Sequence, residues 1–172
     1  MDAGISQADL EALANRLGGV LRSRREWLAT AESCTGGWVA QCVTAISGSS
    51  NWFDRGFVTY SNEAKMEMLG VAETTLERHG AVSEATARAM AQGALEHSRA
   101  DWALAITGVA GPAGGTADKP VGMVCFAWAQ RDGGCEALTA HFTGDREQVR
   151  AQSVRQALTG LLSRLAADTR LA

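Results

Sequence analysis

The chain has 172 residues and a mass of 18.1 kDa, with 46% hydrophobic and 20% charged residues, a composition that fits one folded domain and excludes a disordered or collagen-like chain. Its net charge of −3 argues against direct nucleic-acid binding. Because no apolar run approaches the roughly 20 residues that cross a bilayer, and the N-terminus has no signal-peptide pattern, we expect a cytoplasmic protein without a membrane partner.

The first half of the chain predicts helices alternating with short strands. Ser6 caps a first helix, in which apolar residues recur at helical spacing from Leu10 to Leu21. The following elements are expected to be a buried strand at 27–31, a helix at about 34–46, a strand at 56–60, and helices at 62–69 and about 72–78.

The second half adds a helix capped by Ser83, a strand at 102–107, two strands at 121–129 and 136–142 separated by RDGG, and a last helix at about 146–166. The RDGG segment is typical of a hairpin turn. Strands that alternate with helices and end in a hairpin predict an α/β fold. We expect a single domain over 1–172, with its core at about 6–166, built as a layered α/β/α sandwich around a mixed, mainly parallel sheet.

The four cysteines are Cys34, Cys42, Cys125 and Cys135, and none belongs to a CxxC pair. Cys34 and Cys42 fall on one predicted helix about 12 Å apart, at 1.5 Å per residue, which is too far for a disulfide. With three histidines in the chain, we expect reduced thiols and no metal site.

Three of the predicted strands end in polar or glycine-rich segments. These segments are residues 32–37 (ESCTGG), residues 61–65 (SNEAK), and Thr107 with the glycine-rich loop that follows it. In open α/β sheets, ligands bind beyond the carboxyl ends of parallel strands. If the three strands are parallel, the three segments converge on one crevice.

Ser33 is a candidate nucleophile at the junction between the first strand and the next helix. Backbone N–H groups at such a junction can bind an anion or an oxyanion, and glycines let a ligand approach the backbone closely. Alternatively, Ser33 or Thr35 only caps the helix, and Cys34 is either a rival nucleophile or a small buried side chain. The candidate binding residues in this segment are Cys34, Thr35, Gly36 and Gly37.

Lys65 is a candidate general base, provided that burial or a neighbouring cation lowers its pKa. Tyr60, the only tyrosine in the chain, can relay a proton or orient a substrate. The alternatives are a solvated lysine on a helix and a half-buried aromatic side chain on a strand.

The glycine-rich loop is a candidate phosphate site, because backbone N–H groups can surround a phosphate. It matches neither GxGxxG nor GxxxxGK[ST], so the specific nucleotide motifs are absent. A hydroxyl-rich turn at 47–50 is an alternative phosphate site, and Arg146 is either a further phosphate ligand or an ordinary surface arginine. The candidate residues are Ser49, Ser50, Thr107, Gly108, Gly111, Gly114, Gly115 and Arg146.

Four segments together resemble the C-terminal domain of the competence/damage-inducible protein CinA, a family whose short free-standing members are nicotinamide-nucleotide amidases. They are TAESCTGGWVA, GSSNWFDRGFVTYSNEAKMEMLGV, HGAVSEATARAMA and ITGVAGPAGGTADKPVGMV. The resemblance covers roughly residues 6–166, with the motifs in the same order and without departures.

The resemblance implies hydrolysis of nicotinamide mononucleotide to nicotinate mononucleotide and ammonia, with no cofactor or metal. It implies Ser33 as the nucleophile, Lys65 as the general base and Tyr60 as an assisting residue. Because the family name is associated with competence and DNA damage, the alternative is a regulatory module that binds a nucleotide without turnover. We also expect a homo-oligomer, namely a dimer, which exposed apolar surface on the first helix would favour.

Overall fold

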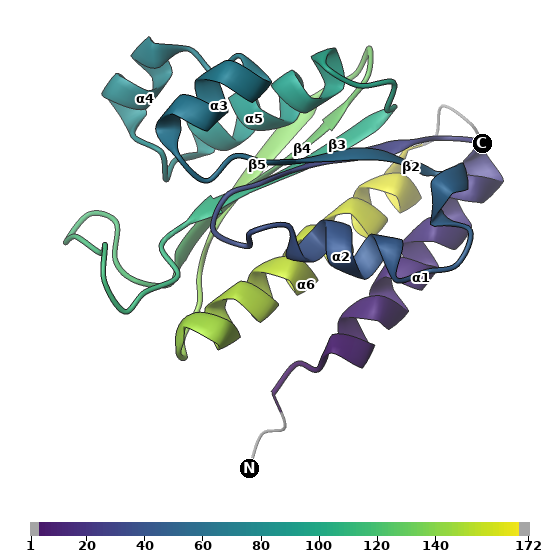
Figure 1. The fold of residues 1–172 in the computed structure, drawn as a ribbon, viewed down its shortest axis with the longest axis horizontal. Coiled ribbons are helices and arrows are strands. Elements are labelled where there is room, and N and C mark those ends of the chain that lie inside the picture. Colours follow the sequence, from purple (N-terminus) through teal and green to yellow (C-terminus); the bar gives the residue numbers. More distant parts are fainter. Residues whose placement is uncertain (1–3, 169–172) are drawn as a thin grey trace.

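The computed structural model describes residues 4–168 and contains a five-stranded sheet between two layers of helices (Figure 1). The strands are β1 (Leu28–Glu32), β2 (Phe53–Val58), β3 (Trp102–Gly108), β4 (Met123–Gln130) and β5 (Cys135–His141). The helices are α1 (Gln7–Arg24), α2 (Trp38–Thr44), the 3-10 helix η1 (Ser49–Asn51), α3 (Asn62–Leu69), α4 (Glu73–His79), α5 (Glu84–Glu96) and α6 (Arg146–Ala167). The outer limits of the predicted domain, residues 1 and 172, lie outside the described residues.

The strand order in the sheet is β2-β1-β3-β4-β5. Strand β1 pairs in parallel with β2 and with β3, whereas β3 with β4 and β4 with β5 form antiparallel pairs. Four of the strands therefore run in one direction and β4 runs against them. The predicted mixed, mainly parallel sheet is confirmed.

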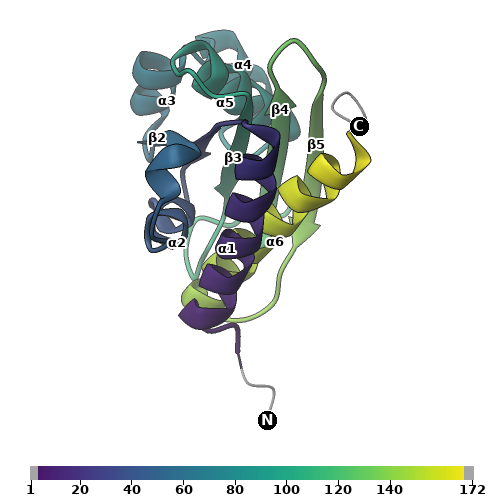
Figure 2. The ribbon, with the colours of Figure 1, turned by 90° about the vertical axis from the view of Figure 1, so that its right-hand side faces the viewer.

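The two helical layers cover opposite faces of the sheet. Helices α1, α2 and α6 lie on one face, and α3, α4 and α5 lie on the other (Figures 1 and 2). Side chains alternate along the strands, so Leu104 and Ile106 of β3 enter the first core while Ala103 and Ala105 enter the second. Because both faces are covered, β1 and β3 read in the sequence as continuous apolar runs.

The second core is built largely from small side chains. Strands β1, β3 and β4 all present alanines to this face, and the facing side of α5 consists largely of alanines and a glycine. At Gly93 of α5, an added Cβ would lie 2.0 Å from the backbone oxygen of Leu69, so only glycine lets α5 approach the end of α3 this closely. This close packing fixes α3, which carries Lys65, against α5.

Two predicted boundaries are wrong, and both lie next to the predicted crevice. The helix expected at 34–46 begins at Trp38, because residues 34–37 form a turn in which Gly36 and Gly37 have φ values of 61° and 99°. Cys34 therefore does not share a helix with Cys42. The strand expected at 56–60 spans 53–58, because β1 ends at Glu32, the register partner of Val58, and the chain then leaves the sheet.

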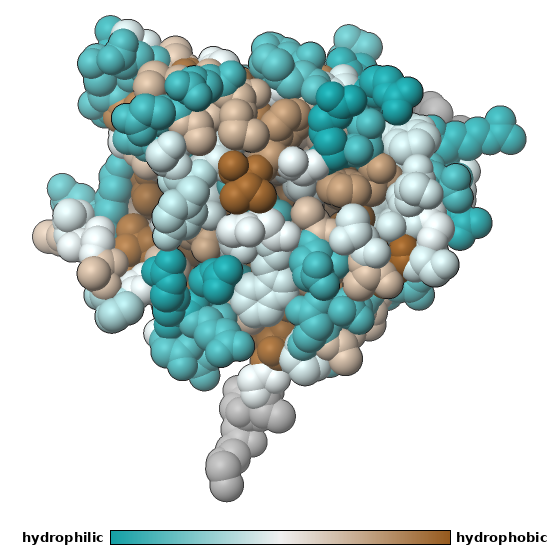
Figure 3. Space-filling model, viewed as in Figure 1, coloured by the Kyte–Doolittle hydropathy of each residue, from teal (hydrophilic) through white to brown (hydrophobic). Residues whose placement is uncertain are grey.

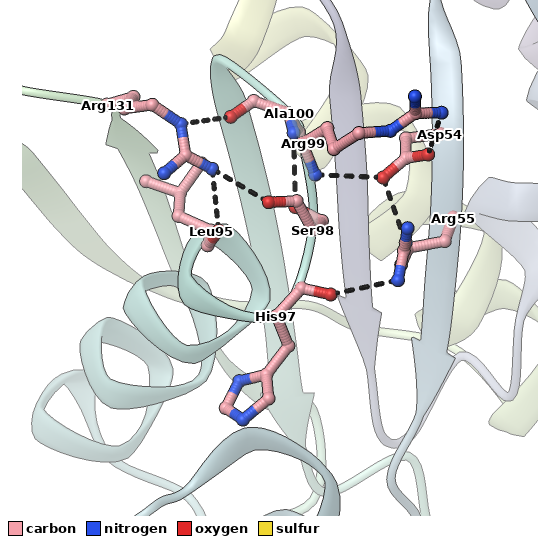
Figure 4. A network of polar contacts seen from close by, with 8 residues as sticks. All are labelled: Asp54, Arg55, Leu95, His97, Ser98, Arg99, Ala100 and Arg131. Carbon is pink, nitrogen blue, oxygen red and sulfur yellow. Dashed lines mark hydrogen bonds and ion pairs between the residues drawn. The ribbon is translucent and has the colours of Figure 1, made fainter.

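The other end of the parallel strands is closed by a network of polar contacts (Figure 4). The Asp54 carboxylate accepts hydrogen bonds from the Arg55 side chain (2.8 Å) and from the backbone N–H of Arg99 (3.0 Å). Arg131, which follows β4, donates to the carbonyl oxygens of Leu95 (2.6 Å) and Ala100 (2.8 Å). This network ties the start of β2 and the β4–β5 hairpin to the connection between α5 and β3.

The apolar stripe of α1 lies in the first core, where Leu10, Leu17 and Leu21 are fully buried. The helix therefore does not offer the apolar surface that would favour a dimer, and the homo-oligomer stays a prediction. In Figure 3, apolar residues on the visible face form small, separate patches between polar ones. Among the helices of residues 4–168, none is both long and apolar enough to cross a membrane.

Two adjacent glycines of α1 provide a test of this packing. A Cβ at Gly18 would lie 2.5 Å from a ring carbon of the buried Trp52, whereas a Cβ at Gly19 would meet nothing within 4 Å. We expect Gly18→Ala to lower the free energy of unfolding by about 1–3 kcal/mol through overpacking. Gly19→Ala should raise it by up to about 1 kcal/mol, because alanine favours helix. Urea unfolding measures both, and equal effects at the two positions would contradict the packing described.

Candidate active site

The carboxyl ends of the three parallel strands meet at one edge of the sheet, as the sequence predicted. In the register, Glu32 of β1 stands opposite Val58 of β2 and Ile106 of β3, so the segments that follow these residues emerge side by side. A cavity of about 280 Å³ lies there. Nine predicted site residues line it, namely Ser33, Cys34, Tyr60, Lys65, Thr107, Gly108, Gly111, Gly114 and Arg146.

The central contact of the cavity joins two of these residues. The Nζ atom of Lys65 lies 3.0 Å from the Oγ atom of Ser33, although the residues are 32 positions apart in the chain. Nζ also donates to the carbonyl oxygen of Thr59 at 2.9 Å, and it lies 3.4 Å from the carbonyl oxygens of Tyr60 and Ser61. Carbonyl oxygens of the segment between β2 and α3 thus surround the amine and hold it within hydrogen-bond distance of the Ser33 hydroxyl.

Lys65 is buried, with 1% of its surface exposed, although it sits on a helix that is otherwise largely exposed. Burial lowers the pKa of its ammonium group below the ordinary value of 10.5, while the neighbouring Cys34 thiol acts in the opposite direction. Within residues 4–168, no carboxylate forms an ion pair with this amine. Burial without a counter-ion thus shifts the equilibrium toward the neutral amine, which is the form that a general base requires.

Cys34 also lines the cavity, but its thiol is poorly suited to be the nucleophile. Burial raises the pKa of this thiol to about 12, and the charge of Glu32 adds to the effect. With so high a pKa, the thiol stays protonated at neutral pH. The reactive form of cysteine is the thiolate, so Cys34 is a poor nucleophile there. Of the two candidate nucleophiles, Ser33 is the one whose side chain hydrogen-bonds the amine of Lys65.

Ser33 does not sit directly at a helix N-terminus, since the turn of residues 34–37 separates it from α2. Its backbone N–H donates to the carbonyl oxygen of Ile106 (3.0 Å), and its own carbonyl oxygen accepts from Gly36 (3.0 Å). Neither Ser33 nor Thr35 caps α2, because Gly37 occupies the cap position without a side-chain hydrogen bond. The capping alternative for these two residues is therefore wrong.

The capping group is instead Glu32, which the sequence analysis missed. Its buried carboxylate accepts hydrogen bonds from the backbone N–H groups of Val39 (2.8 Å) and Ala40 (3.1 Å) and from the hydroxyl of Thr35 (2.7 Å). Burial raises the pKa of the Glu32 carboxyl, while these three hydrogen bonds act against that shift. The signal that could have revealed this role is a charged residue, Glu32, at the end of an otherwise apolar, buried strand.

Arg146 links two walls at the mouth of the cavity. One nitrogen of its guanidinium donates to the carbonyl oxygen of Gly111 (2.8 Å) in the glycine-rich loop, and the other donates to the hydroxyl of Tyr60 (3.1 Å). Tyr60 is 64% exposed, so its ring stands at the opening rather than in the core. A cation and a phenol are therefore available to a ligand at the mouth.

Six predicted binding residues do not line the cavity. Ser49 and Ser50 lie in η1 before β2, at the other end of the strand, and Thr35 is buried with its hydroxyl on Glu32. Gly36 and Gly37 have positive φ values and form the turn after Cys34, outside the cavity wall. Gly115 packs against the backbone of Val121, since an added Cβ would lie 2.8 Å from the Val121 nitrogen. The turn at 47–50 is thus not placed to bind a phosphate in this cavity.

The structure also adds wall residues that the sequence analysis did not single out. The hydroxyl of Thr107 donates to the carbonyl oxygen of Ala81 (2.7 Å), which brings the connection between α4 and α5 to the cavity. The additional lining residues are Asn62, Ala81, Val82, Val109, Ala110 and Ala113. Most of them are apolar and lie in loops, where no local pattern marks them.

A larger hollow of about 790 Å³ lies between residues 4–7, Trp38 and the start of α6. It contains the hydroxyls of Ser6 and Thr143, but neither lysine nor histidine belongs to its lining. Within residues 4–168, no three His, Cys, Asp or Glu side chains are grouped as metal ligands would be. The Ser33–Lys65 cavity is therefore the better candidate for a catalytic site.

The fold and the cavity define a class of protein, namely an α/β domain with a serine–lysine pair beyond the carboxyl end of β1, the middle one of its three adjacent parallel strands. Residues 10–165 match the CinA C-terminal domain family, and the chain belongs to that family.

Relatives and solved structures agree with this assignment. The nicotinamide-nucleotide amidohydrolase PncC of Escherichia coli K12 is 50% identical over 167 residues, which cover 96% of this chain and all of that protein. A putative competence-damage inducible protein of Symbiobacterium thermophilum is 52% identical over 159 residues, but the match covers only 37% of its length. The crystal structure of the competence/damage inducible protein CihA from Agrobacterium tumefaciens matches 96% of this chain and 99% of its own, with a TM-score of 0.89 and 45% identity.

The lowered pKa of Lys65 predicts a signature in stability. Between that lowered pKa and the ordinary value of 10.5, the unfolded chain binds a proton that the folded chain has released, so this group makes stability rise with pH. Lys65→Met lacks this contribution. We therefore expect the unfolding free energy of the wild type, minus that of Lys65→Met, to increase as the pH is raised toward 10.5. Urea unfolding over this range measures the difference, and a constant or decreasing difference would show that the lysine is not perturbed.

Proposed function

We propose that this protein hydrolyses the carboxamide of nicotinamide mononucleotide to give nicotinate mononucleotide and ammonia, with Ser33 and Lys65 as its catalytic pair. The observation that carries the proposal is the 3.0 Å contact between the Ser33 hydroxyl and a buried lysine amine. The names of relatives that match over most of their length support the choice of substrate, since four of them are called nicotinamide-nucleotide amidohydrolase PncC.

In the first step, neutral Lys65 accepts the proton of the Ser33 hydroxyl while the Ser33 oxygen attacks the carboxamide carbon. The attack converts the amide oxygen into an oxyanion on a tetrahedral carbon. Lys65, now protonated, gives its proton to the amide nitrogen, and the carbon–nitrogen bond breaks to release ammonia. The nicotinoyl group remains as an ester on Ser33.

In the second step, water attacks the ester carbon and passes a proton to Lys65. The second tetrahedral intermediate collapses, the ester bond breaks, and the Ser33 oxygen takes back the proton from Lys65. The product is a carboxylic acid, which loses its remaining proton to the released ammonia or to water and leaves as a carboxylate. The same amine therefore acts as base and then as acid in each half-reaction, and the cycle uses no cofactor.

The backbone N–H groups that follow Ser33 are the candidate oxyanion donors. Among them, the N–H of Cys34 belongs to a residue that lines the cavity, and within residues 4–168 it donates to no backbone carbonyl, whereas Thr35 is fully buried. Removing one such donor in comparable sites costs about 3–4 kcal/mol of transition-state stabilisation. The N–H group of Cys34 thus supplies a reason why Ser33 is followed by a turn rather than by a regular element.

The nucleotide part of the substrate is assigned to the mouth of the cavity. The glycine-rich loop, with Gly111 and Gly114 in the wall, can present backbone N–H groups to the phosphate. Arg146 adds the only permanently charged side chain of the lining and is already oriented by Gly111 and Tyr60. Tyr60 then offers its ring and its hydroxyl to the substrate at the entrance.

Substitutions at the two rival nucleophiles test the assignment. Ser33→Ala should abolish ammonia release from nicotinamide mononucleotide, because it removes the attacking oxygen, while thermal unfolding stays close to the wild type. Cys34→Ala should keep most of the activity, since the protonated thiol takes no part.

Two results would oppose this assignment. An active Ser33→Ala with an inactive Cys34→Ala would transfer the nucleophile to the thiol. A wild-type protein that binds the mononucleotide by calorimetry but releases no ammonia would favour a regulatory binding module instead.

The pH dependence of the rate tests the base. We expect kcat to rise with pH as Lys65 loses its proton and to level off below 10.5, because burial lowers the pKa of this amine. Cys34→Ala should keep this rise, with any shift toward lower pH because Cys34 raises the pKa of Lys65. That result would separate the amine from the thiol, whose pKa is about 12. A rate that is flat or falls between neutral and mildly alkaline pH would argue against a lysine base.

A further inference from the structure

The glycine-rich loop, which joins β3 to β4 over residues 109–122, forms one wall of the Ser33–Lys65 cavity. Figure 1 shows it projecting beyond the end of the sheet, below α4 in that view. Residues 112–118 of the loop are all exposed, although Ala113 and Gly114 line the cavity. A segment with so little buried surface has a low local stability unless other contacts hold it.

Two cationic side chains hold the loop, one at each end of this exposed segment. At its start, Arg146 donates to the carbonyl oxygen of Gly111, as described above. At its end, the amine of Lys119 donates to the carbonyl oxygen of His79, the last residue of α4. A lysine is favourable at this place, because it satisfies a free carbonyl at the negative end of a helix.

The surroundings of Lys119 fit this contact on both sides. Lys119 is half-buried, unlike the exposed segment before it, and its backbone N–H donates to the hydroxyl of Thr116 (3.0 Å). The N–H of Thr116 donates back to the carbonyl oxygen of Lys119 (2.9 Å), so the end of the loop is a closed turn. On the side of α4, a Cβ at Gly80 would lie 2.5 Å from the Lys119 Nζ atom, so glycine leaves room for the amine. Within residues 4–168, Lys119 forms no ion pair that would compete.

The carbonyl that Lys119 holds belongs to a second wall of the cavity, the connection between α4 and α5, of which Ala81 is a lining residue. The next two carbonyl oxygens of this connection are also held. That of Gly80 accepts a hydrogen bond from the hydroxyl of Thr86 (2.6 Å) in α5. That of Ala81 accepts one from the hydroxyl of Thr107 (2.7 Å) in β3. Lys119 therefore attaches the exposed loop to a wall that is itself anchored to a helix and to the sheet.

We propose that Lys119 is a positioning residue, which holds the glycine-rich loop against the α4–α5 connection so that the loop meets the phosphate of the substrate in a fixed position. The inference rests on the proposed function, because it assigns this loop to the phosphate. Lys119 itself does not line the cavity and does not touch the reacting atoms. Its effect belongs to substrate binding, since the phosphate stays bound in the ground state and in the transition state.

The kinetic test compares Lys119→Met with Arg78→Met. Arg78 precedes His79 on α4, is exposed and has no side-chain hydrogen bond or ion pair within the described residues, so both variants remove one positive charge from the same end of the helix. We expect Lys119→Met to raise KM for nicotinamide mononucleotide by about 5-fold to 20-fold and to leave kcat within about twofold of the wild type. Arg78→Met should match the wild type in both constants. Lys119→Arg keeps a cationic donor and should recover part of the loss in KM.

Nicotinamide riboside separates the phosphate from the rest of the substrate, because it has the same carboxamide and ribose but no phosphate. Calorimetry in a Ser33→Ala background measures the Kd of each compound without turnover. Adding Lys119→Met should raise the Kd of the mononucleotide and leave that of the riboside within about twofold. An equal rise for both compounds would contradict the link to the phosphate. Circular dichroism and thermal unfolding of each variant identify any loss that comes from misfolding.

A last readout needs no substrate. In the free protein, NMR order parameters of the backbone amides of residues 113–118 should be lower in Lys119→Met than in the wild type and in Arg78→Met, because the loop has lost one of its two anchors. A wild-type protein without amidase activity would end the proposed function, and the order parameters would still test Lys119. A raised KM with unchanged order parameters would mean that the lysine binds the substrate directly, and would overturn the inference. Wild-type KM in a folded Lys119→Met, or a loss confined to kcat, would overturn it as well.

Discussion

The site depends on one contact, in which the amine of Lys65 meets the hydroxyl of Ser33 inside a cavity that keeps the amine dry. A solvated lysine is protonated near neutral pH and cannot take a proton from serine. The fold solves this problem by burying Lys65 on α3 and by closing the segment between β2 and α3 around it. The same burial disfavours the protonated amine in the folded state, so the group that serves catalysis also costs stability near neutral pH.

The rest of the structure serves to bring that pair together. The parallel pairing of β1 with β2 and β3 aligns three strand ends, and each end contributes one wall of the cavity. The alanine-rich second core lets α5 pack closely on the sheet, and α3 in turn packs against α5. At the opposite end of the strands, the network around Asp54 and Arg131 closes the sheet without facing the cavity (Figure 4).

Much of this arrangement was predictable from the sequence, because it follows local patterns. The apolar runs of β1 and β3 and the capped helices α1, α3 and α5 were predicted to within a few residues, and the convergence of three strand ends followed from their order. The errors lie where long-range contacts decide the structure. Residues 34–37 form a turn because Glu32 and Arg150, which lies 115 positions beyond Thr35, hold it, and no local pattern reveals such a partner. The hydroxyls of Ser49 and Ser50 resembled a binding turn, but the topology places them at the wrong end of β2.

The most direct test of the account is the protonation state of Lys65 in the folded protein. The chain has only two lysines, Lys65 and Lys119, so an NMR titration with labelled lysine follows two side chains, and Lys119→Arg assigns their signals. The account predicts that the Lys65 signal titrates clearly below 10.5, the ordinary value for a lysine. A Lys65 amine that titrates at or above that value would be a permanent cation, and the serine–lysine mechanism would lose its base.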